Sequence, residues 1–434
     1  MAAPDAALLA TAKRQLRAHV AQLIAEKRWR AEPQSPDERA ALREQLAGVA
    51  DRAWRPHRAS LPPAVRTQAI EELLDEITGL GPLEPLFKDP AISEILVNGP
   101  EEVYVERHGQ LERLATTFES REQLTYFIER ILSPIGRRIT EAEPFVDARL
   151  PDGSRVNVVI APMALTGPYL SIRRFSKDVL TIEDLVRQGT VTRPIAAFLS
   201  ACVLARCNII LSGASGAGKT TTLNALAHVM PAHERVVVME DIAELQFRDH
   251  HVVRMETRPP SLSGLAEVTM RDLLKNALHM RPDRIIVGEV RGAEALEMLQ
   301  AMNTGHDGCM ATLHANTPHD VIARIETMAL MTQLELSGEA IRRQVVSALD
   351  LVVHLERFPD GSRHIVSISE VAKGPRGEVS GEPLHELFAY HHAATADRAV
   401  SAGQLVATGA RPQSSLLRRL ERAKAALPDH VFEL

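Results

Sequence analysis

The chain has 434 residues, of which 45% are hydrophobic and 24% are charged. This composition is that of an ordinary globular protein and excludes a largely disordered chain, while the length predicts two or three domains at ~100–200 residues each. The net charge of −6 disfavours a protein that coats nucleic acid. Three cysteines are too few for a disulfide framework or a four-cysteine zinc site. The longest apolar stretch, residues 195–205, is far shorter than the ~18–20 residues that span a bilayer. We therefore expect a cytoplasmic protein whose membrane association, if any, is peripheral.

Residues 1–60 predict a short helical extension. Apolar residues recur at helical spacing at Leu16, Val20 and Leu23, and the stretch EPQSPDE interrupts them, with Asp37 as a candidate cap of the helix that follows. This segment holds 11 Lys and Arg against 7 Asp and Glu. A solvated helical pair that packs on its neighbour is favoured over a lipid-binding helix.

Residues 61–169 predict an α+β domain built on an antiparallel sheet. A helix is expected over 65–78 and another over 121–132, and strand–turn–strand patterns surround Asn98-Gly99 and Asp152-Gly153. Residues 170–180 then form a short basic linker. From residue 181 to 434 the pattern becomes α/β, because the apolar runs NIILS, VVVME, RIIVGE and CMATLH alternate with helical segments. Such runs indicate a parallel sheet that is covered on both faces.

The strongest local motif follows NIILS and precedes a predicted helix. It fits G-x-x-x-x-G-K-[ST], a loop whose backbone N–H groups surround a phosphate chain at the N-terminus of a helix. In such a loop Lys219 reaches the β- and γ-phosphates and the Thr220 hydroxyl binds Mg²⁺. The predicted nucleotide-binding residues are Gly213, Ala214, Ser215, Gly216, Ala217, Gly218, Lys219, Thr220 and Thr221.

Three further predicted strands end in polar residues, at Glu240-Asp241, Glu289 and His314. Ligands of parallel sheets bind beyond the carboxyl ends of the strands, so these side chains are expected to meet at the phosphate loop. Glu240 and Glu289 are candidates for orienting the attacking water and for the metal shell, and the sequence does not decide which does which. His314 either senses the γ-phosphate or holds its own loop; His306 and Asp307 are weaker candidates, and Cys309 is expected in the core.

Positive charge to complete the nucleotide site must come from residues other than Lys219. Arg173 and Arg174 lie in the predicted linker, and Arg149 and Arg155 flank the hairpin of the preceding domain. A solvated surface role is the ordinary expectation for each. Together they fit a site that is completed by the other domain or by a neighbouring subunit, in the manner of arginine fingers.

These motifs resemble those of CpaF-type ATPases of tight-adherence (Tad/Flp) pilus assembly, in the type II/IV secretion ATPase superfamily. Matching stretches extend from residue 80 to about 371 and include GLGPLEPLFKDPAISEILVNGP, FVDARLPDGSRVN, SIRRFS, GASGAGKTTTLNAL, EDIAELQF, MRPDRIIVGEVRGAEALEMLQAMNTGHDG, TLHAN and ARIETMALM. The resemblance implies a RecA-like ATPase domain that uses ATP and Mg²⁺. It also implies a hexameric ring at the cytoplasmic face of a bacterial inner membrane, working with platform proteins of a pilus or secretion machine.

The resemblance also implies roles in metal binding and catalysis for particular residues. Thr220, Glu240 and Glu289 would lie around Mg²⁺, and the catalytic set would be Lys219, Glu240, Glu289, His314, Arg173 and Arg174. Gly288 stands where a Walker B aspartate is usual elsewhere, as is typical of this superfamily. Two readings from other classes compete with the ATPase: an ATP-binding regulatory or scaffold ring with little turnover, and a nucleic-acid-dependent motor. Scarce aromatics, at 4%, disfavour the motor, and no nucleic-acid partner is expected.

Overall fold

The structure is a computed structural model. It describes residues 6–25, 36–55, 61–78, 81–107, 109–115, 117–174, 180–247, 250–258, 266–332, 336–373, 383–392, 403–425, 427–428 and 430–433. The chain divides into two compact units, residues 1–175 and 176–434, which are treated separately below. Among the described residues, no helix is both long and apolar enough to cross a membrane.

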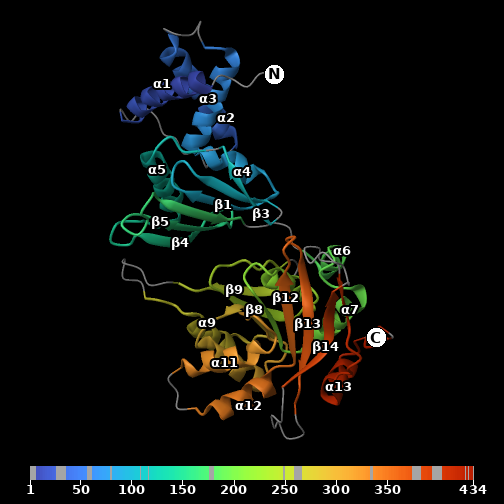
Figure 1. The fold of residues 1–434 in the computed structure, drawn as a ribbon. Coiled ribbons are helices and arrows are strands. Elements are labelled where there is room, and N and C mark those ends of the chain that lie inside the picture. The colour runs from blue at the N-terminus through green and yellow to red at the C-terminus, as the bar shows by residue number, and fades with distance from the viewer. Residues whose placement is uncertain are drawn as a thin grey trace. The chain divides into compact units, whose positions relative to one another are not determined.

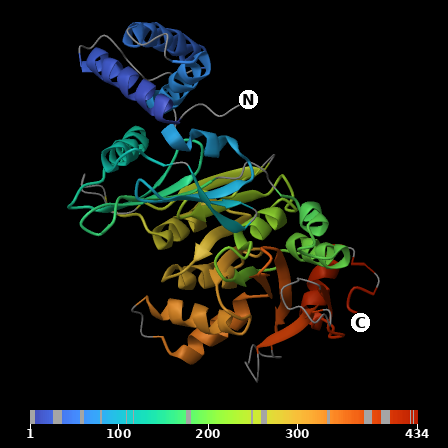
Figure 2. The same ribbon diagram turned by 45° about the horizontal axis from the view of Figure 1, so that its top comes forward.

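The first unit begins with three helices that share one apolar core (Figures 1 and 2). These are α1 (Ala6–Ala25), α2 (Pro36–Ala53) and α3 (Pro63–Thr78). The fully buried Trp54 donates its indole N–H to the Ala12 carbonyl at 3.0 Å, which joins the end of α2 to α1. The predicted boundary at residue 60 separated α3 from the extension, whereas the structure packs α3 with α1 and α2. The amphipathic face of α3 is covered by those two helices.

The rest of the first unit is a six-stranded antiparallel sheet in the order β3-β2-β1-β6-β5-β4. Its elements are η2 (Gly81–Leu83), α4 (Glu84–Lys88), β1 (Ile92–Asn98), β2 (Val103–Arg107), β3 (Gln110–Leu114), α5 (Arg121–Leu132), η3 (Ser133–Ile135), β4 (Phe145–Arg149), β5 (Arg155–Val159) and β6 (Tyr169–Arg173). The antiparallel sheet agrees with the prediction. The predicted linker begins too early, because residues 170–173 pair with β1 and β5 as strand β6. Residues 175–179 of the linker lie outside the described residues.

The second unit is an α/β structure around a nine-stranded sheet in the order β15-β14-β13-β12-β7-β11-β10-β8-β9. The strands are β7 (Ile209–Gly213), β8 (Arg235–Glu240), β9 (His251–Glu256), β10 (Arg284–Val290), β11 (Met310–His314), β12 (Leu351–Arg357), β13 (Arg363–Val371), β14 (Leu384–His392) and β15 (Gly403–Ala407). The strands from β12 to β9 run parallel, as the β-branched apolar runs predict.

Helices cover both faces of this sheet (Figure 1). One face packs against α6 (Ile182–Arg187), α7 (Arg193–Leu204), α8 (Lys219–Ala227) and α13 (Ser414–Arg422). The other packs against α9 (Met270–Ala277), η4 (Leu278–Met280), α10 (Glu294–Asn303), α11 (Asp320–Leu330) and α12 (Gly338–Ala348). Capping boxes at Thr181/Asp184 and Thr269/Asp272 fix where α6 and α9 begin.

The antiparallel strands β13, β14 and β15 extend one side of the parallel sheet and were not predicted. The turn between β12 and β13 is short: Phe358 N–H donates to the Ser362 carbonyl at 2.9 Å around Asp360-Gly361. This β12–β13 hairpin lies directly beside the central strand β7, because β12 pairs with β7.

Candidate active site

The loop between β7 and α8 has the backbone shape that a phosphate cradle needs. Gly213, Gly216 and Gly218 all have positive φ, at 149°, 73° and 95°, a region that residues with a Cβ rarely adopt. Space as well as conformation requires glycine at 213, since a Cβ there would lie 2.3 Å from the Leu355 carbonyl oxygen. Strand β12 therefore closes one side of the loop.

Lys219 and the threonines after it begin α8. The Lys219 side chain curls back over the loop, where its Nζ donates to the carbonyls of Gly213 at 3.0 Å and Ala214 at 2.7 Å. Lys219 is 7% exposed, Thr220 is half-buried and Thr221 is exposed. The ammonium group is thus held above the cradle at the positive end of a helix.

Strand register brings the predicted polar strand ends together. His314, the last residue of β11, pairs with Gly213 of β7. Leu313 pairs with Val290 of β10, and Val287 of β10 pairs with Met239 of β8. His314, Glu289 and Glu240 therefore end three successive strands on one side of the phosphate loop.

Glu289 and His314 contact each other directly. His314 Nε2 lies 2.7 Å from Glu289 Oε1, and Glu289 Oε2 accepts a hydrogen bond from the Arg291 guanidinium. Partial burial and then the positive charge of Lys219 lower the pKa of His314, although Glu289 opposes the shift. His314 lies beside the loop because it pairs with Gly213 at the end of β7. A neutral His314 at pH 7 is the consequence.

Glu240 is buried at the end of β8, with 3% exposure. Its Oε1 accepts the backbone N–H groups of Glu244 and Leu245, both at 2.8 Å. Its Oε2 lies 3.7 Å from Arg254 Nη2 and has no hydrogen-bond partner among the described residues. Burial raises the pKa of Glu240 against the opposing effect of these two N–H donors. One carboxylate oxygen is therefore anchored, and the other is left as an unsatisfied acceptor.

The glycine at position 288 makes room for Glu240. A Cβ at residue 288 would lie 2.9 Å from Glu240 Cγ. The departure from an aspartate at this position therefore has a steric reason. Asp241, next to Glu240, is held by Thr257 at 3.2 Å and by Arg291 at 3.1 Å, so that Arg291 bridges Asp241 and Glu289.

Two predicted residues of the second unit are not part of this cluster. His306 and Asp307 precede β11 and lie at the opposite end of that strand from His314, and Asp307 pairs with Arg419 at 2.5 Å. In the first unit, the Arg174 guanidinium donates to the carbonyls of Phe87 at 2.7 Å, Ile92 at 3.1 Å and Asp89. Arg174 thus ties β6 to α4 and to the start of β1.

The other arginines of the first unit lie on its sheet. Arg173 is exposed on β6, opposite Glu94 of β1 and Arg155 of β5. Arg155 pairs with Asp147 at 3.4 Å, and Arg149 ends β4. Cys309 is buried, as expected.

Sequence reasoning missed a second layer of polar residues around the loop. Fully buried His354 lies on β12, with Nδ1 2.9 Å from Ser212 Oγ and a further hydrogen bond to the Asn316 backbone just after His314. Asn224 of α8 accepts the Gln246 N–H at 3.1 Å. The only sequence signal for His354 is a polar residue inside an apolar strand.

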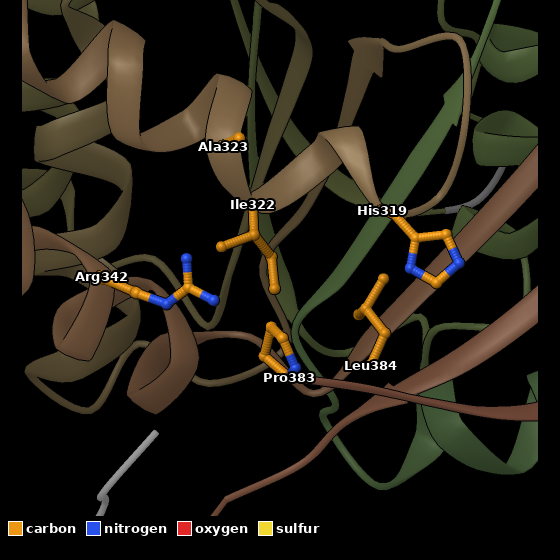
Figure 3. Close-up of a pocket in the computed structure, with 6 residues that line it drawn as sticks. All are labelled: His319, Ile322, Ala323, Arg342, Pro383 and Leu384. Carbon is orange, nitrogen blue, oxygen red and sulfur yellow. The ribbon is translucent and has the colours of Figure 1, made fainter. Parts of the chain in front are cut away.

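A separate pocket of about 300 Å³ lies on another part of the second unit (Figure 3). His319, Ile322 and Ala323 of the α11 region form one wall, and Arg342 of α12 with Pro383 and Leu384 complete it. None of the predicted site residues lines it. Arg342 is paired there with Glu326 at 3.4 Å.

The loop residues fit a bound nucleoside triphosphate. The three glycines with positive φ, the start of α8 and the buried ammonium group form a cradle for an anion. The oxygen donors fit Mg²⁺, because the Thr220 hydroxyl lies in the first turn of α8 and Glu240 Oε2 accepts no hydrogen bond from the described residues. A glycine-rich loop between the central strand of a parallel sheet and the following helix is the arrangement of P-loop proteins.

Comparison with known proteins identifies the family. The family model "Type II/IV secretion system protein" matches residues 76–381. A putative conjugal transfer protein of Mycobacterium tuberculosis (strain ATCC 25618 / H37Rv) is 36% identical over 306 residues, which cover 69% of this chain and 86% of the relative. The type IV secretion system protein VirB11 of Brucella suis biovar 1 is 31% identical, with 67% and 88% covered. The chain belongs to the type II/IV secretion system protein family.

A solved structure supports the fold alone. The Yersinia pseudotuberculosis ATPase DotB aligns with a TM-score of 0.50 at 17% identity, covering 67% of this chain and 78% of that one. The helices α1 and α2 precede the region matched by the family model.

Proposed function

We propose that the protein is a Mg²⁺-dependent ATP hydrolase that works as a hexameric motor of a pilus or secretion machine. The observation that carries this proposal is the convergence of Glu240, Glu289 and His314 beside the loop that holds Lys219. Hydrolysis of a phosphoanhydride needs a directed water and positive charge near the γ-phosphate, and this cluster has groups for both.

The two glutamates differ in their surroundings, which supports a division of roles. Glu289 is engaged by His314 and by Arg291, so it is suited to orienting the histidine and closing the metal shell. Burial raises the pKa of Glu240, which favours a group that accepts a proton from water, and its Oε2, 3.7 Å from Arg254, accepts no hydrogen bond from the described residues. We propose Glu240 as the residue that orients and deprotonates the water.

The remaining residues hold the substrate. The loop N–H groups and Lys219 would bind the phosphates, and Thr220 would hold the metal ion together with Glu289. Bound Mg²⁺ supplies charge that offsets the charge developing on the phosphate oxygens. Neutral His314 can donate its Nε2 hydrogen to Glu289 or to a phosphate oxygen, so it can report whether the γ-phosphate is present.

Within the type II/IV secretion system protein family, we propose that the protein is a CpaF-type ATPase of Tad pilus assembly. The motifs quoted from residue 80 to 371 support it, and the relatives named for conjugal transfer and type IV secretion fit the same class of machine. We propose that the ring binds platform proteins at the cytoplasmic face of a bacterial inner membrane. Exposed Arg173 is the arginine that could act on a neighbouring subunit's nucleotide. Turnover would then move the first unit about the connector that ends near residue 180.

Steady-state phosphate release by the purified protein tests the hydrolase. Lys219→Ala should abolish turnover. Glu240→Gln and Glu289→Gln should each retain ATP binding, and Glu240→Gln should reduce kcat by about 10²–10⁴-fold, the range of general-base catalysis. Stoichiometric ATP binding without continuing phosphate release by the wild type would instead identify a scaffold ring.

A further inference from the structure

The β12–β13 hairpin places two arginines against the phosphate loop. Arg363 Nε donates to the Gly216 carbonyl at 2.9 Å, and the Arg363 stem lies 3.2 Å from where a Cβ of Gly218 would be. Arg357 pairs with Arg363 across the hairpin, and its Nη1 lies 3.4 Å from a Cβ built on Gly216. Arg357 is half-buried and Arg363 is exposed, so both guanidinium groups lie at the surface of the loop.

The hairpin is held firmly in this position. His364 donates from Nδ1 to the Gly189 carbonyl at 2.9 Å, and Ile365 N–H donates to the Thr190 carbonyl at 3.0 Å. Phe358 packs against the His364 ring at 4.9 Å and against Tyr390 at 5.3 Å between centroids. These contacts fix the hairpin to the turn before α7 and to β14, so the arginines start from a preorganised position.

The sheet order sets the direction in which a nucleotide must lie. β7 has β11 on one side and β12 on the other. Glu240, Glu289 and His314 all belong to strands on the β11 side, so the terminal phosphate must point that way if these residues act on it. The nucleoside end then leaves the loop on the β12 side, where Arg357 and Arg363 lie.

We propose that the β12–β13 hairpin forms the nucleoside side of the nucleotide site, with Arg357 and Arg363 as its contacts to the ribose and base. This inference rests on the proposed ATP site and deepens it. A guanidinium group suits this position because it can donate hydrogen bonds to hydroxyl and ring acceptors and can also stack its flat face on a base. Arg363 has a second task, since its bond to Gly216 helps shape the loop.

Equilibrium binding separates recognition of the nucleoside from recognition of phosphate. The probes are ATP (titrated as a non-hydrolysable analogue), ADP and inorganic tripolyphosphate, each titrated with Mg²⁺ into the full-length wild type, Arg357→Ala and Arg363→Ala. The affinities of ATP and ADP should fall about tenfold, or ~1.4 kcal/mol, in each variant, while that of tripolyphosphate should fall less. Arg363→Lys keeps the charge and most of the stem, so it should lose ATP affinity with little change for tripolyphosphate.

Arg343→Ala is the matched control. Arg343 is an exposed arginine of α12 that pairs with Glu339 four residues earlier, and its loss should leave all three affinities unchanged. Melting temperatures of all variants without nucleotide identify any that fail to fold. If an alanine variant fails to fold, the test is made with Arg363→Lys. An equal loss for all three probes, or no loss for any of them, would overturn the inference.

These titrations, together with the assay of steady-state phosphate release, keep the two proposals apart. A wild type that binds ATP but releases no phosphate refutes the hydrolase and leaves the hairpin test intact. A wild type that hydrolyses ATP, with hairpin variants that bind ATP normally, refutes only the inference. Failure of the wild type to bind any nucleotide would refute both.

Discussion

Glu240 shows how single residues in this site depend on each other. Its anchored oxygen holds the loop after β8, its other oxygen lies 3.7 Å from Arg254 without a hydrogen bond among the described residues, and glycine at 288 leaves it the necessary space. Burial of this carboxyl raises its pKa. As the pH is lowered, activity that needs the carboxylate should therefore begin to decline at a higher pH than it would with an ordinary glutamate. The motif predicted the residue, but only its neighbours explain its chemistry.

Gly213→Ala should destabilise the second unit strongly. The new Cβ would meet the Leu355 carbonyl at 2.3 Å and would impose a positive φ on an alanine. We expect a loss of at least ~2 kcal/mol in the free energy of unfolding, measured by chemical denaturation. Gly338→Ala is the control, because a Cβ there meets nothing within 4 Å and alanine favours the helix. Equal stability of the two variants would contradict the steric argument.

Glu370→Gln should change how stability depends on pH. Burial raises the pKa of Glu370 to about 7, well above its ordinary value of 4.5. Between these two values the unfolded chain releases this proton first, so the stability present at low pH is lost as the pH rises through the folded-state pKa. The variant keeps an acceptor for the Gln413 N–H and removes the titration. From pH 5 to pH 8 the unfolding free energy of the wild type should therefore fall by roughly 2 kcal/mol more than that of the variant. Parallel pH profiles would contradict this.

At the scale of elements, the site is built from segments that converge only in the folded sheet. Helix α8 carries Lys219 and also holds residue 246 of the loop after β8 through Asn224. Strand β12 supplies His354 behind the loop, and its hairpin with β13 supplies the arginines in front of it. Local periodicity predicted the parallel strands, yet it gave no indication that β12 pairs with β7 and β13 with β12, because strand order depends on contacts between distant segments.

Asn224→Ala should uncouple α8 from the loop that follows Glu240. Without the 3.1 Å bond to Gln246 N–H, that loop loses an anchor, and Glu240 is expected to be positioned less well. We expect kcat for ATP to fall several-fold to tenfold, with ATP affinity within about twofold, because a positioning error affects the transition state most. Asn224→Asp keeps the acceptor oxygen and should retain more activity. A loss of ATP affinity as large as the loss of kcat would assign Asn224 to nucleotide binding instead.

At the scale of the whole molecule, the chain consists of two units that each have their own core. The nucleotide site described here lies within the second unit. The first unit holds both arginines that the sequence assigned to catalysis, and they differ: Arg174 is tied to backbone carbonyls of its own unit, whereas Arg173 is exposed on the sheet. Of the two, Arg174 has the structural role, and Arg173 is the exposed one.

Arg173→Ala and Arg174→Ala should therefore separate activity from folding. We expect Arg174→Ala to lower the melting temperature, because the carbonyls of Phe87, Asp89 and Ile92 lose a charged donor. Arg173→Ala should melt like the wild type and lose turnover in the assembled protein. Mixing Arg173→Ala with Lys219→Ala subunits should restore part of the activity if the arginine acts across an interface. Unchanged turnover of Arg173→Ala would remove it from the mechanism.

Local residue patterns were enough to predict the type of each unit, the phosphate loop and the polar strand ends, because these depend on residues within a few positions of each other. The packing of distant segments was needed to learn that α3 packs with α1 and α2, that residues 170–173 belong to β6, and that Arg174 binds its own unit's backbone. It also decided that Arg357 and Arg363 contact the loop. These outcomes depend on which distant segments exclude water from one another, and that choice is made by packing the whole chain rather than by any local pattern.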